Sequence, residues 1–293
     1  MLEKEDIHRY EQRINGIEHY LRNVSARNKD IILSFKNYLF TQGLSKGRIL
    51  KYVECLKKWS EVAASLQEVK NKDLDTLTKT DLQTMVSFIQ QEPYSPWTKQ
   101  TYRVILKKFV CWNKKAKPGK IPKEIEWLKL GFNKAELKLP GEGQLLTKEE
   151  IEKAINTCTT LRDKAFLSLL YESGCRIGEL ASLKIGNITF DTYGAQLVIM
   201  GKTGSRRIRI INTSFLLRSF LETHPLRDKN DGSLWVSQRS NRTFTPVKYG
   251  AIRTMVHNAF LNAGIKKRCN PHLFRHSRAT EMASFLTEFQ MNQ

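Results

Sequence analysis

The stretch GCRIGEL at residues 174–180 is the part of this 293-residue sequence that most constrains its fold. It places Arg176 directly after a Gly–Cys turn, just before a short helical pattern. Two more basic stretches follow in chain order: GKTG at residues 201–204 with Lys202, and PHLFRH at residues 271–276 with His272 and Arg275. Guanidinium groups bind two phosphate oxygens at once and stay charged at physiological pH. The three stretches together therefore predict a site that holds a phosphodiester and transfers its phosphate.

Each side chain of this set suits one part of such a reaction. His272 and Arg275 are three residues apart, so a helix places both on one face. A histidine there can donate a hydrogen bond to phosphate or move a proton near neutral pH. Lys202, between glycines in a hairpin loop, can protonate a leaving oxygen in a suitable electrostatic setting. Glu179, three residues after Arg176, can pair with an arginine and fix its fork, so we expect an orienting group rather than a base.

Taken singly, these residues also have plain structural interpretations. An arginine is most often a solvated surface charge, a loop lysine is usually exposed, and a histidine at a helix start commonly makes a local bond. The order of the three stretches along the chain, more than any one residue, favours the phosphate site.

The charge of the whole chain indicates a polyanionic partner. Lysine and arginine number 49 against 29 acidic residues, a net charge of +20, and both halves of the sequence are basic. An even spread favours a protein that meets nucleic acid along its whole length. The alternative is a merely soluble, lysine-rich protein. With 40% hydrophobic residues, the chain has room for two domains with cores of their own.

The cysteines and the N-terminus indicate where the protein works. The five cysteines are scattered, without Cys-x-x-Cys or zinc-ligand spacing, which predicts a reducing compartment and no metal site. The start, MLEKED, lacks an apolar signal region, and no apolar run reaches the roughly 18 residues of a membrane span. We expect a cytoplasmic, nucleoid-associated protein without a membrane partner.

The first half of the sequence is typical of helices only. Residues 1–24 predict a helix, either a partner-binding arm or the first helix of the domain that follows. Residues 25–115 contain further apolar stripes at helical spacing and predict a small all-helical domain. Residues 116–146 are basic and contain Pro and Gly, so they predict a linker, with a short helix near 124–130.

The second half, residues 147–293, predicts a mainly helical domain with a small antiparallel sheet. Thr147 and Glu150 form a capping-box pattern at its first helix. Strand patterns at 196–200 and 206–211 flank the glycine-bearing loop and predict a β-hairpin. Pro246 is placed as the first residue of a helix. The fold class is therefore mainly α.

The three basic stretches, in this order and separation, resemble those of the phage integrase, or tyrosine recombinase, family. The resemblance is strong over residues 147–286, weaker over 25–115, and most similar to archaeal and mobile-element integrases. It implies a helical core-binding domain and a catalytic domain that form a C-shaped clamp on double-stranded DNA. It also implies strand cutting and rejoining through a phosphotyrosyl intermediate, without metal or cofactor, in a tetramer of protomers on the DNA.

The resemblance also implies roles for the matching residues. Arg176 and Arg275 would bind the scissile phosphate, Lys202 would be the general acid toward the 5′ oxygen, and His272 would assist proton transfer. Glu179 would support the site.

Two positions of the family pattern have no match. The family has a His or Trp after the His-x-x-Arg helix, and no residue here matches it. The family's nucleophilic tyrosine lies beyond the His-x-x-Arg helix, whereas the last tyrosine here is Tyr249, and neither it nor Tyr171 or Tyr193 stands in that place. We therefore expect a catalytic domain truncated before its nucleophile and inactive alone. Three alternatives remain: a recombinase seen without its tyrosine, a non-catalytic DNA-binding regulator derived from one, and an unrelated basic nucleic-acid-binding module.

Overall fold

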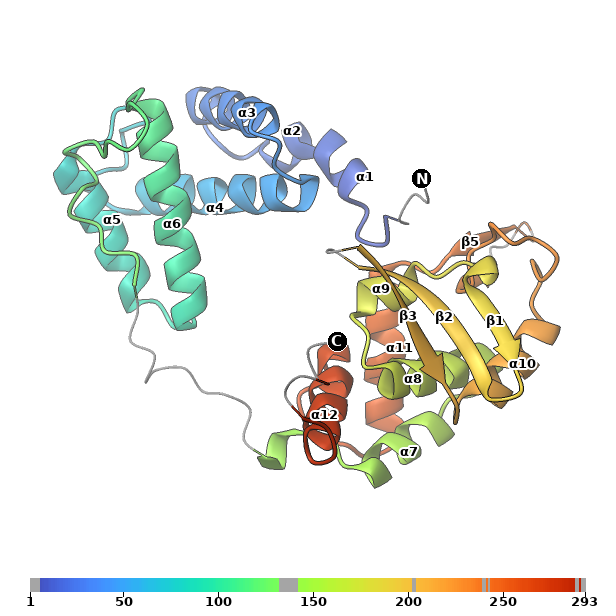
Figure 1. The fold of residues 1–293 in the computed structure, drawn as a ribbon. Coiled ribbons are helices and arrows are strands. Elements are labelled where there is room, and N and C mark those ends of the chain that lie inside the picture. The colour runs from blue at the N-terminus through green and yellow to red at the C-terminus, as the bar shows by residue number, and fades with distance from the viewer. Residues whose placement is uncertain are drawn as a thin grey trace. The chain divides into compact units, whose positions relative to one another are not determined.

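The computed structural model describes residues 6–131, 142–201, 204–238, 241, 243–287 and 290. The chain divides into two compact units. One is Tyr10–Leu139, and the other combines Met1–Arg9 with Pro140–Gln293 (Figure 1).

The first unit consists of helices and turns in its described part. Its helices are α1 (Tyr10–Asn15), α2 (Ile17–Tyr20), α3 (Ala26–Thr41), α4 (Lys46–Ser65), α5 (Lys79–Gln91) and α6 (Pro96–Asn113). The segment predicted as one helix over residues 1–24 is instead two short helices, α1 and α2, separated at Gly16.

Side-chain caps fix where these helices begin. Ser25 and Ser95 each accept a backbone hydrogen bond from the third residue after them, and Thr78 forms a full capping box with Asp81. The apolar stripes converge on one core, in which Trp59 and Phe109 are fully buried. Burying each such side chain contributes about 2–3 kcal/mol to stability.

The helix predicted near 124–130 is absent, and the structure has turns there. Ile125 and Leu128 are nevertheless buried in the core of the first unit. A seven-residue segment bounded by Pro122 is too short to sustain a helix by itself. This part of the predicted linker therefore belongs to the first unit.

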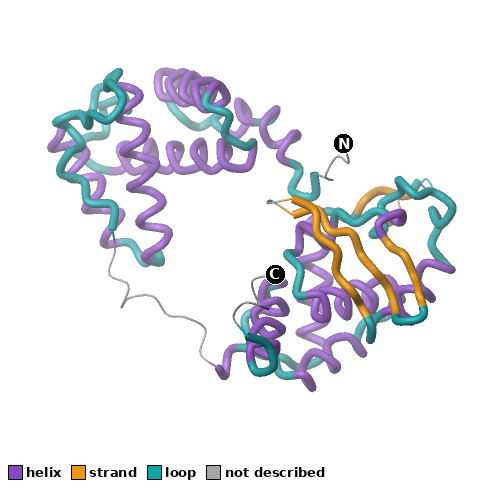
Figure 2. Tube along the Cα trace, in the orientation of Figure 1, coloured by secondary structure: helices purple, strands orange, loops and turns teal. Residues whose placement is uncertain are grey.

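The second unit packs a small antiparallel sheet beside a group of helices (Figures 1 and 2). The helices are α7 (Lys148–Asn156), α8 (Leu161–Ser173), α9 (Ile177–Ala181), α10 (Ser214–Glu222), α11 (Tyr249–Asn262) and α12 (Pro271–Ala283). The strands are β1 (Ile188–Asp191), β2 (Gly194–Gly201), β3 (Gly204–Ile210), β4 (Val236–Gln238) and β5 (Phe244–Pro246).

The sheet order is β1-β2-β3, with a separate two-stranded ribbon of β4 and β5. Leu197 on β2 lies opposite Ile188 on β1 and Ile208 on β3. Because side chains alternate along a strand, Ala195, Leu197 and Ile199 all face the core, where they are fully buried. The predicted hairpin around residues 201–204 is confirmed in its flanking strands.

One predicted helix start is wrong. Pro246 ends strand β5, opposite Val236 of β4, and α11 begins only at Tyr249. Proline lacks a backbone N–H, which suits an edge strand as well as the first turn of a helix. The sequence signal was therefore ambiguous, and the pairing with β4 decides it.

The start of the chain packs in the second unit. Ile7 is 3% exposed and lies in that unit's core. Its carbonyl oxygen accepts a hydrogen bond from the backbone N–H of Tyr249 at 3.0 Å. The rings of His8 and Tyr249 have centroids 4.8 Å apart. No local sequence pattern indicates this contact, because it joins residues far apart in the chain.

Among the helices that the structure describes, none combines the length and the apolar composition that crossing a membrane requires.

Candidate active site

Arg176 stands at a sharp turn between two helices. Helix α8 ends at Gly174, whose φ of 56° lies in the left-handed region that favours glycine. Arg176 then begins α9 as its N-cap residue. Its side chain is 57% exposed, so the guanidinium group is held at its base and open to a ligand.

Glu179 is the buried anion that pairs with Arg176 in this site. Its side chain is 2% exposed, and its carboxylate accepts the backbone N–H of Arg176 at 3.0 Å and Nη1 of Arg176 at 3.1 Å. It also accepts Nη2 of Arg206 at 2.8 Å and Nη1 at 3.3 Å. Burial alone raises the pKa of Glu179, but hydrogen bonds from Arg206 and then Arg176 outweigh it and lower the pKa to about 2. Such a carboxylate stays ionised and is unsuited to act as a base.

Sequence reasoning missed Arg206. It lies on β3 opposite Ile199, on the face that also carries Ile208 and Ile210. A signal was present, because the alternation Arg206, Ile208, Ile210 places one charge in a row of otherwise apolar, core-facing positions. An inward-facing charge of this kind needs a partner, and Glu179 is that partner.

Helix α12 brings His272 and Arg275 to the same turn. Asn270 caps the helix by accepting the backbone N–H of His272 at 3.0 Å, and Pro271 is the first helical residue. Nη1 of Arg275 donates a hydrogen bond to the carbonyl oxygen of Gly174, beside Arg176 in the chain. Burial lowers the pKa of His272, and the positive charges of His276, Arg275 and Arg176 lower it further. The imidazole is therefore neutral at physiological pH, and it lies near both arginines.

Lys202 lies outside the described residues. Its neighbours Gly201 and Gly204 pair with each other at the end of the hairpin. A Cβ atom at Gly201 would lie 3.2 Å from both Nη1 of Arg206 and Oε1 of Glu179. Gly201, the residue before Lys202 in sequence, thus packs against this ion pair.

Contacts between α8 and α12 hold the two arginine-bearing segments together. The Tyr171 hydroxyl donates to Glu281 at 2.6 Å, and Arg278 donates to the same carboxylate at 2.7 Å. The backbone N–H of Leu146 donates to the buried hydroxyl of Ser277 at 2.8 Å. Burial first, and then Glu281, raises the pKa of Tyr171 to about 12. The Tyr171 hydroxyl thus joins α8 to α12 through Glu281.

The other two tyrosines considered from the sequence lie elsewhere. Tyr193 follows β1 in the turn to β2 and is 74% exposed. Tyr249 begins α11 and packs on His8. In the described part of the chain, no three His, Cys, Asp or Glu side chains lie close enough together to hold a metal ion.

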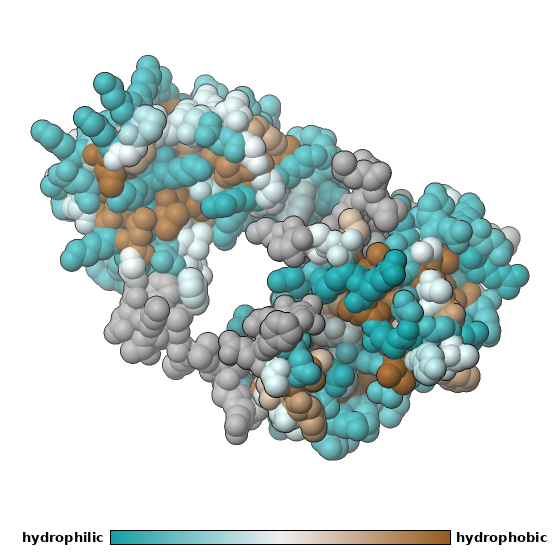
Figure 3. All heavy atoms as spheres, in the orientation of Figure 1, coloured by the Kyte–Doolittle hydropathy of each residue, from teal (hydrophilic) through white to brown (hydrophobic). Residues whose placement is uncertain are grey.

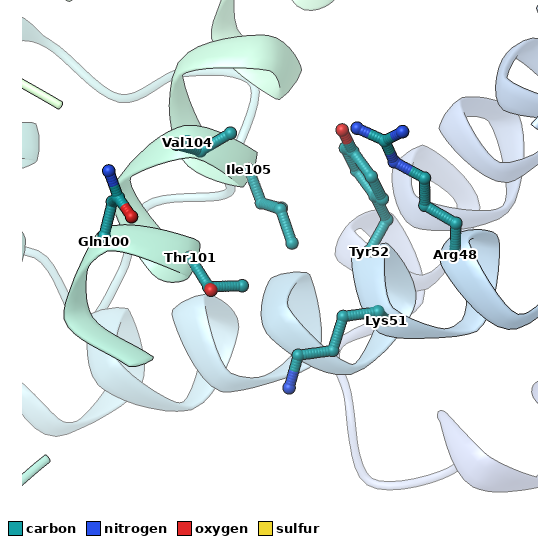
Figure 4. A pocket seen from close by; sticks show the side chains of 7 residues that line it. All are labelled: Arg48, Lys51, Tyr52, Gln100, Thr101, Val104 and Ile105. Carbon is teal, nitrogen blue, oxygen red and sulfur yellow. The ribbon is translucent and has the colours of Figure 1, made fainter. Parts of the chain in front are cut away.

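The first unit has a basic pocket of about 180 Å³ between α4 and α6 (Figure 4). Its lining joins charged, polar and apolar side chains: Arg48, Lys51, Tyr52, Gln100, Thr101, Val104 and Ile105. The ammonium group of Lys108 lies 5.4 Å from the centre of the Tyr52 ring. Burial and then the charge of Arg48 lower the pKa of Lys108. Hydrophilic and hydrophobic side chains are interleaved on the visible face of this unit (Figure 3).

Comparison with known proteins bears directly on the second unit. Residues 144–285 match the model of the phage integrase family. The tyrosine recombinase XerA of Pyrococcus horikoshii is 28% identical over 263 residues, which cover 87% of this chain and 80% of that protein. The tyrosine recombinase XerC of Histophilus somni is 33% identical over 141 residues, covering 47% of this chain and 44% of its own.

Solved structures agree in fold. A lambda integrase fragment, crystallised as a dimer bound to a COC′ core site, has a TM-score of 0.64 at 13% identity, covering 90% of this chain and 92% of its own. The XerH recombinase in a post-cleavage complex with its difH substrate has a TM-score of 0.61 at 20% identity, covering 94% and 83%. The predicted fold class, mainly helical with a small antiparallel sheet, is confirmed.

The turn at Gly174, the ion pairs of Glu179 and the start of α12 all lie within the matched segment. Residues 144–285, which make up most of the second unit, are thus similar to the phage integrase family.

Proposed function

We propose that this protein is a site-specific DNA recombinase that binds a scissile phosphate with Arg176, Arg275 and His272. The observation that carries this proposal is the meeting of α12 with the α8–α9 turn. There Arg275 is hydrogen-bonded to Gly174, and the charges of both arginines act on His272.

The two arginines supply the electrostatic part of the reaction. A phosphodiester gains negative charge on its non-bridging oxygens as a fifth oxygen approaches. Preorganised guanidinium groups stabilise that charge more in the transition state than in the ground state. Losing one such donor typically lowers the rate by about two to three orders of magnitude.

His272 and Lys202 have the proton-transfer roles. A neutral imidazole can accept the proton of an attacking hydroxyl, and the lowered pKa of His272 keeps it neutral. Lys202 would protonate the leaving 5′ oxygen. This role rests on its place in the sequence between strands β2 and β3.

Double-stranded DNA is the proposed substrate. The net charge of +20 favours phosphate contacts, and the α4–α6 pocket offers Arg48 and Lys51 beside the aromatic ring of Tyr52. Two of the similar structures are complexes with DNA, which supports the same partner here. Assembly with further protomers on DNA is part of the proposal.

We further propose that the attacking tyrosine is not among Tyr171, Tyr193 and Tyr249, the three tyrosines of the second unit, and that these 293 residues alone form no covalent adduct with DNA. The observation that favours this is the place of each hydroxyl, above all that of Tyr171 on Glu281. The second candidate function, a DNA-binding regulator without catalysis, rests on the same observation.

A strand-sealing assay separates the two functions without needing the tyrosine. A nicked duplex carries p-nitrophenyl phosphate at the 3′ end of the nick and a free 5′ hydroxyl at the other; we call it the sealing duplex. The 5′ oxygen bonds to phosphorus, the bond from phosphorus to the nitrophenyl oxygen breaks, and p-nitrophenolate leaves. The hydroxyl proton passes to a base, and the nitrophenyl oxygen stands in for that of tyrosine.

The duplex sequence is selected from a randomised pool by its binding to the chain, and the nick is placed at each position in turn. A recombinase releases p-nitrophenolate and seals the strand at one defined position. A regulator binds the same duplex and seals none, and that result would overturn the proposed catalytic function.

A further inference from the structure

We propose that Arg206 is a positioning residue of the phosphate-transfer site, which acts through the carboxylate of Glu179 to fix Arg176 and to clamp the β2–β3 hairpin onto α9. This inference rests on the proposed function, because it assigns Arg206 a part in the same reaction.

The geometry gives Glu179 two arginine partners with different surroundings. Arg176 bonds to it through one side-chain nitrogen and the backbone N–H, and leaves most of its fork open. Arg206 bonds to both carboxylate oxygens through both of its terminal nitrogens. Arg206 is therefore the bidentate partner of Glu179, and Arg176 keeps N–H donors free for a ligand.

The burial of Glu179 explains why one arginine is not enough to keep its carboxylate ionised. A carboxylate that is 2% exposed takes up a proton unless cations keep it ionised. Arg176, with 57% of its side chain exposed, is screened by water and holds the charge only weakly. Arg206 is 34% exposed, and its hydrogen bonds are the largest of the contributions that lower the pKa of Glu179. Without Arg206, the carboxylate would lose the strongest of its stabilising hydrogen bonds and would hold Arg176 less firmly.

The same ion pair joins two elements that carry different parts of the site. Glu179 lies on α9 with Arg176 at its start, and Arg206 lies on β3 next to the hairpin loop. Gly201 packs on the pair so closely that an added Cβ would stand 3.2 Å from each partner. The pair thus sets where the end of the hairpin lies relative to α9.

The test compares Arg206→Gln and Arg206→Lys with a matched control, Arg209→Gln. Arg209 lies on the same strand but on the opposite face, where it pairs with Asp191 at 2.7 Å. Each variant is assayed on the sealing duplex for kcat and KM, after its fold is checked by circular dichroism.

We expect Arg206→Gln to lower kcat about tenfold to a hundredfold with KM nearly unchanged, because a displacement of about 1 Å in a reacting group costs up to about a hundredfold. Arg206→Lys keeps the charge and should restore part of the rate. Arg206→Gln combined with Glu179→Gln should cost little more than either change alone, since both break one pathway. Full activity of a folded Arg206→Gln, or strictly multiplicative losses in the double variant, would overturn the inference.

A second readout is independent of catalysis. The guanidinium nitrogens of Arg176 are followed by nuclear magnetic resonance in the free protein, where an ion-paired fork rotates slowly. We expect that rotation to become fast in Arg206→Gln, to be intermediate in Arg206→Lys, and to stay slow in Arg209→Gln. If the wild-type chain fails to seal DNA, the proposed function fails, and this spectrum still decides whether Arg206 positions Arg176. If Arg206→Gln does not fold, Arg206→Lys carries both tests.

Discussion

Arg275 donates a hydrogen bond to the carbonyl oxygen of Gly174, two residues before Arg176 in the chain. Arg275 is thus hydrogen-bonded to the turn that carries Arg176, although the two arginines are far apart in sequence. The left-handed Gly174 makes the turn possible, and the Glu281 contacts to Tyr171 and Arg278 keep α12 against α8.

The acid stability of the second unit should depend on Glu179. Its folded pKa is about 2, below the ordinary value of 4.5, so it contributes stability above pH 4.5 that is lost as the pH falls toward 2. The contribution is on the order of 3 kcal/mol at neutral pH. Urea unfolding of wild type and Glu179→Gln should differ by this order at pH 7 and converge near pH 2. The exposed Glu152, changed to Gln, is the control; a constant difference across this range would contradict the assignment.

Sealing activity should persist at mildly acidic pH. Burial and nearby positive charges lower the pKa of His272 below the ordinary value of 6.5, so the imidazole stays neutral as the pH falls through 6.5. The sealing rate should drop only at lower pH. His272→Gln should lower the rate and remove this acidic limb of the pH–rate profile. The exposed His257, changed to Gln, should leave the profile unchanged. A midpoint above 6.5 in the wild type would argue against this environment.

The first residues should stabilise the second unit. Ile7 is 3% exposed in that unit's core, and its side chain lies against Gly178 of α9, where an added Cβ would be 3.9 Å from it. Ile7→Ala should reduce the free energy of unfolding by about 2–4 kcal/mol, as for other buried isoleucines. Ile211, which is 63% exposed, gives the matched control, and its change to Ala should stay within about 0.5 kcal/mol. Equal small effects in urea unfolding would show that the segment does not pack there in solution.

The α4–α6 pocket should bind the DNA backbone. Replacing Arg48 or Lys51 with Ala should weaken duplex binding for many sequences alike and reduce the slope of log affinity against log salt by about 1. Fluorescence anisotropy over a salt series measures this. Lys29→Ala on α3, near Glu18, is the control. An unchanged slope in both pocket variants would place the DNA contacts elsewhere.

Local sequence signals predicted the elements, and long-range pairing decided the rest. The glycine at 174 and the Asn-Pro pair at 270–271 mark helix ends by local chemistry, so Arg176, His272 and Arg275 could be placed at helix starts from the sequence. The alternation around Arg206 indicates an inward-facing charge, but its partner Glu179 could not be assigned, because that contact depends on how β3 pairs with β2 and packs near α9.

The same distinction explains the errors. Pro246 fits both a helix start and an edge strand, and only its pairing with Val236 separates them. Ile7 enters the second unit's core through a bond to Tyr249, which no local pattern indicates. The helix expected near Leu128 is replaced by turns that still bury this side chain, because tertiary packing does not require helical backbone.

The role of Arg275 is tested by the single-turnover sealing rates of wild type and Arg275→Ala on the same sealing duplex, with affinity measured in parallel. We expect site-specific sealing by the wild type and a loss of about two to three orders of magnitude in Arg275→Ala, with affinity nearly intact. Equal rates for the two proteins, or a loss explained entirely by weaker binding, would contradict the claim that Arg275 acts on the scissile phosphate.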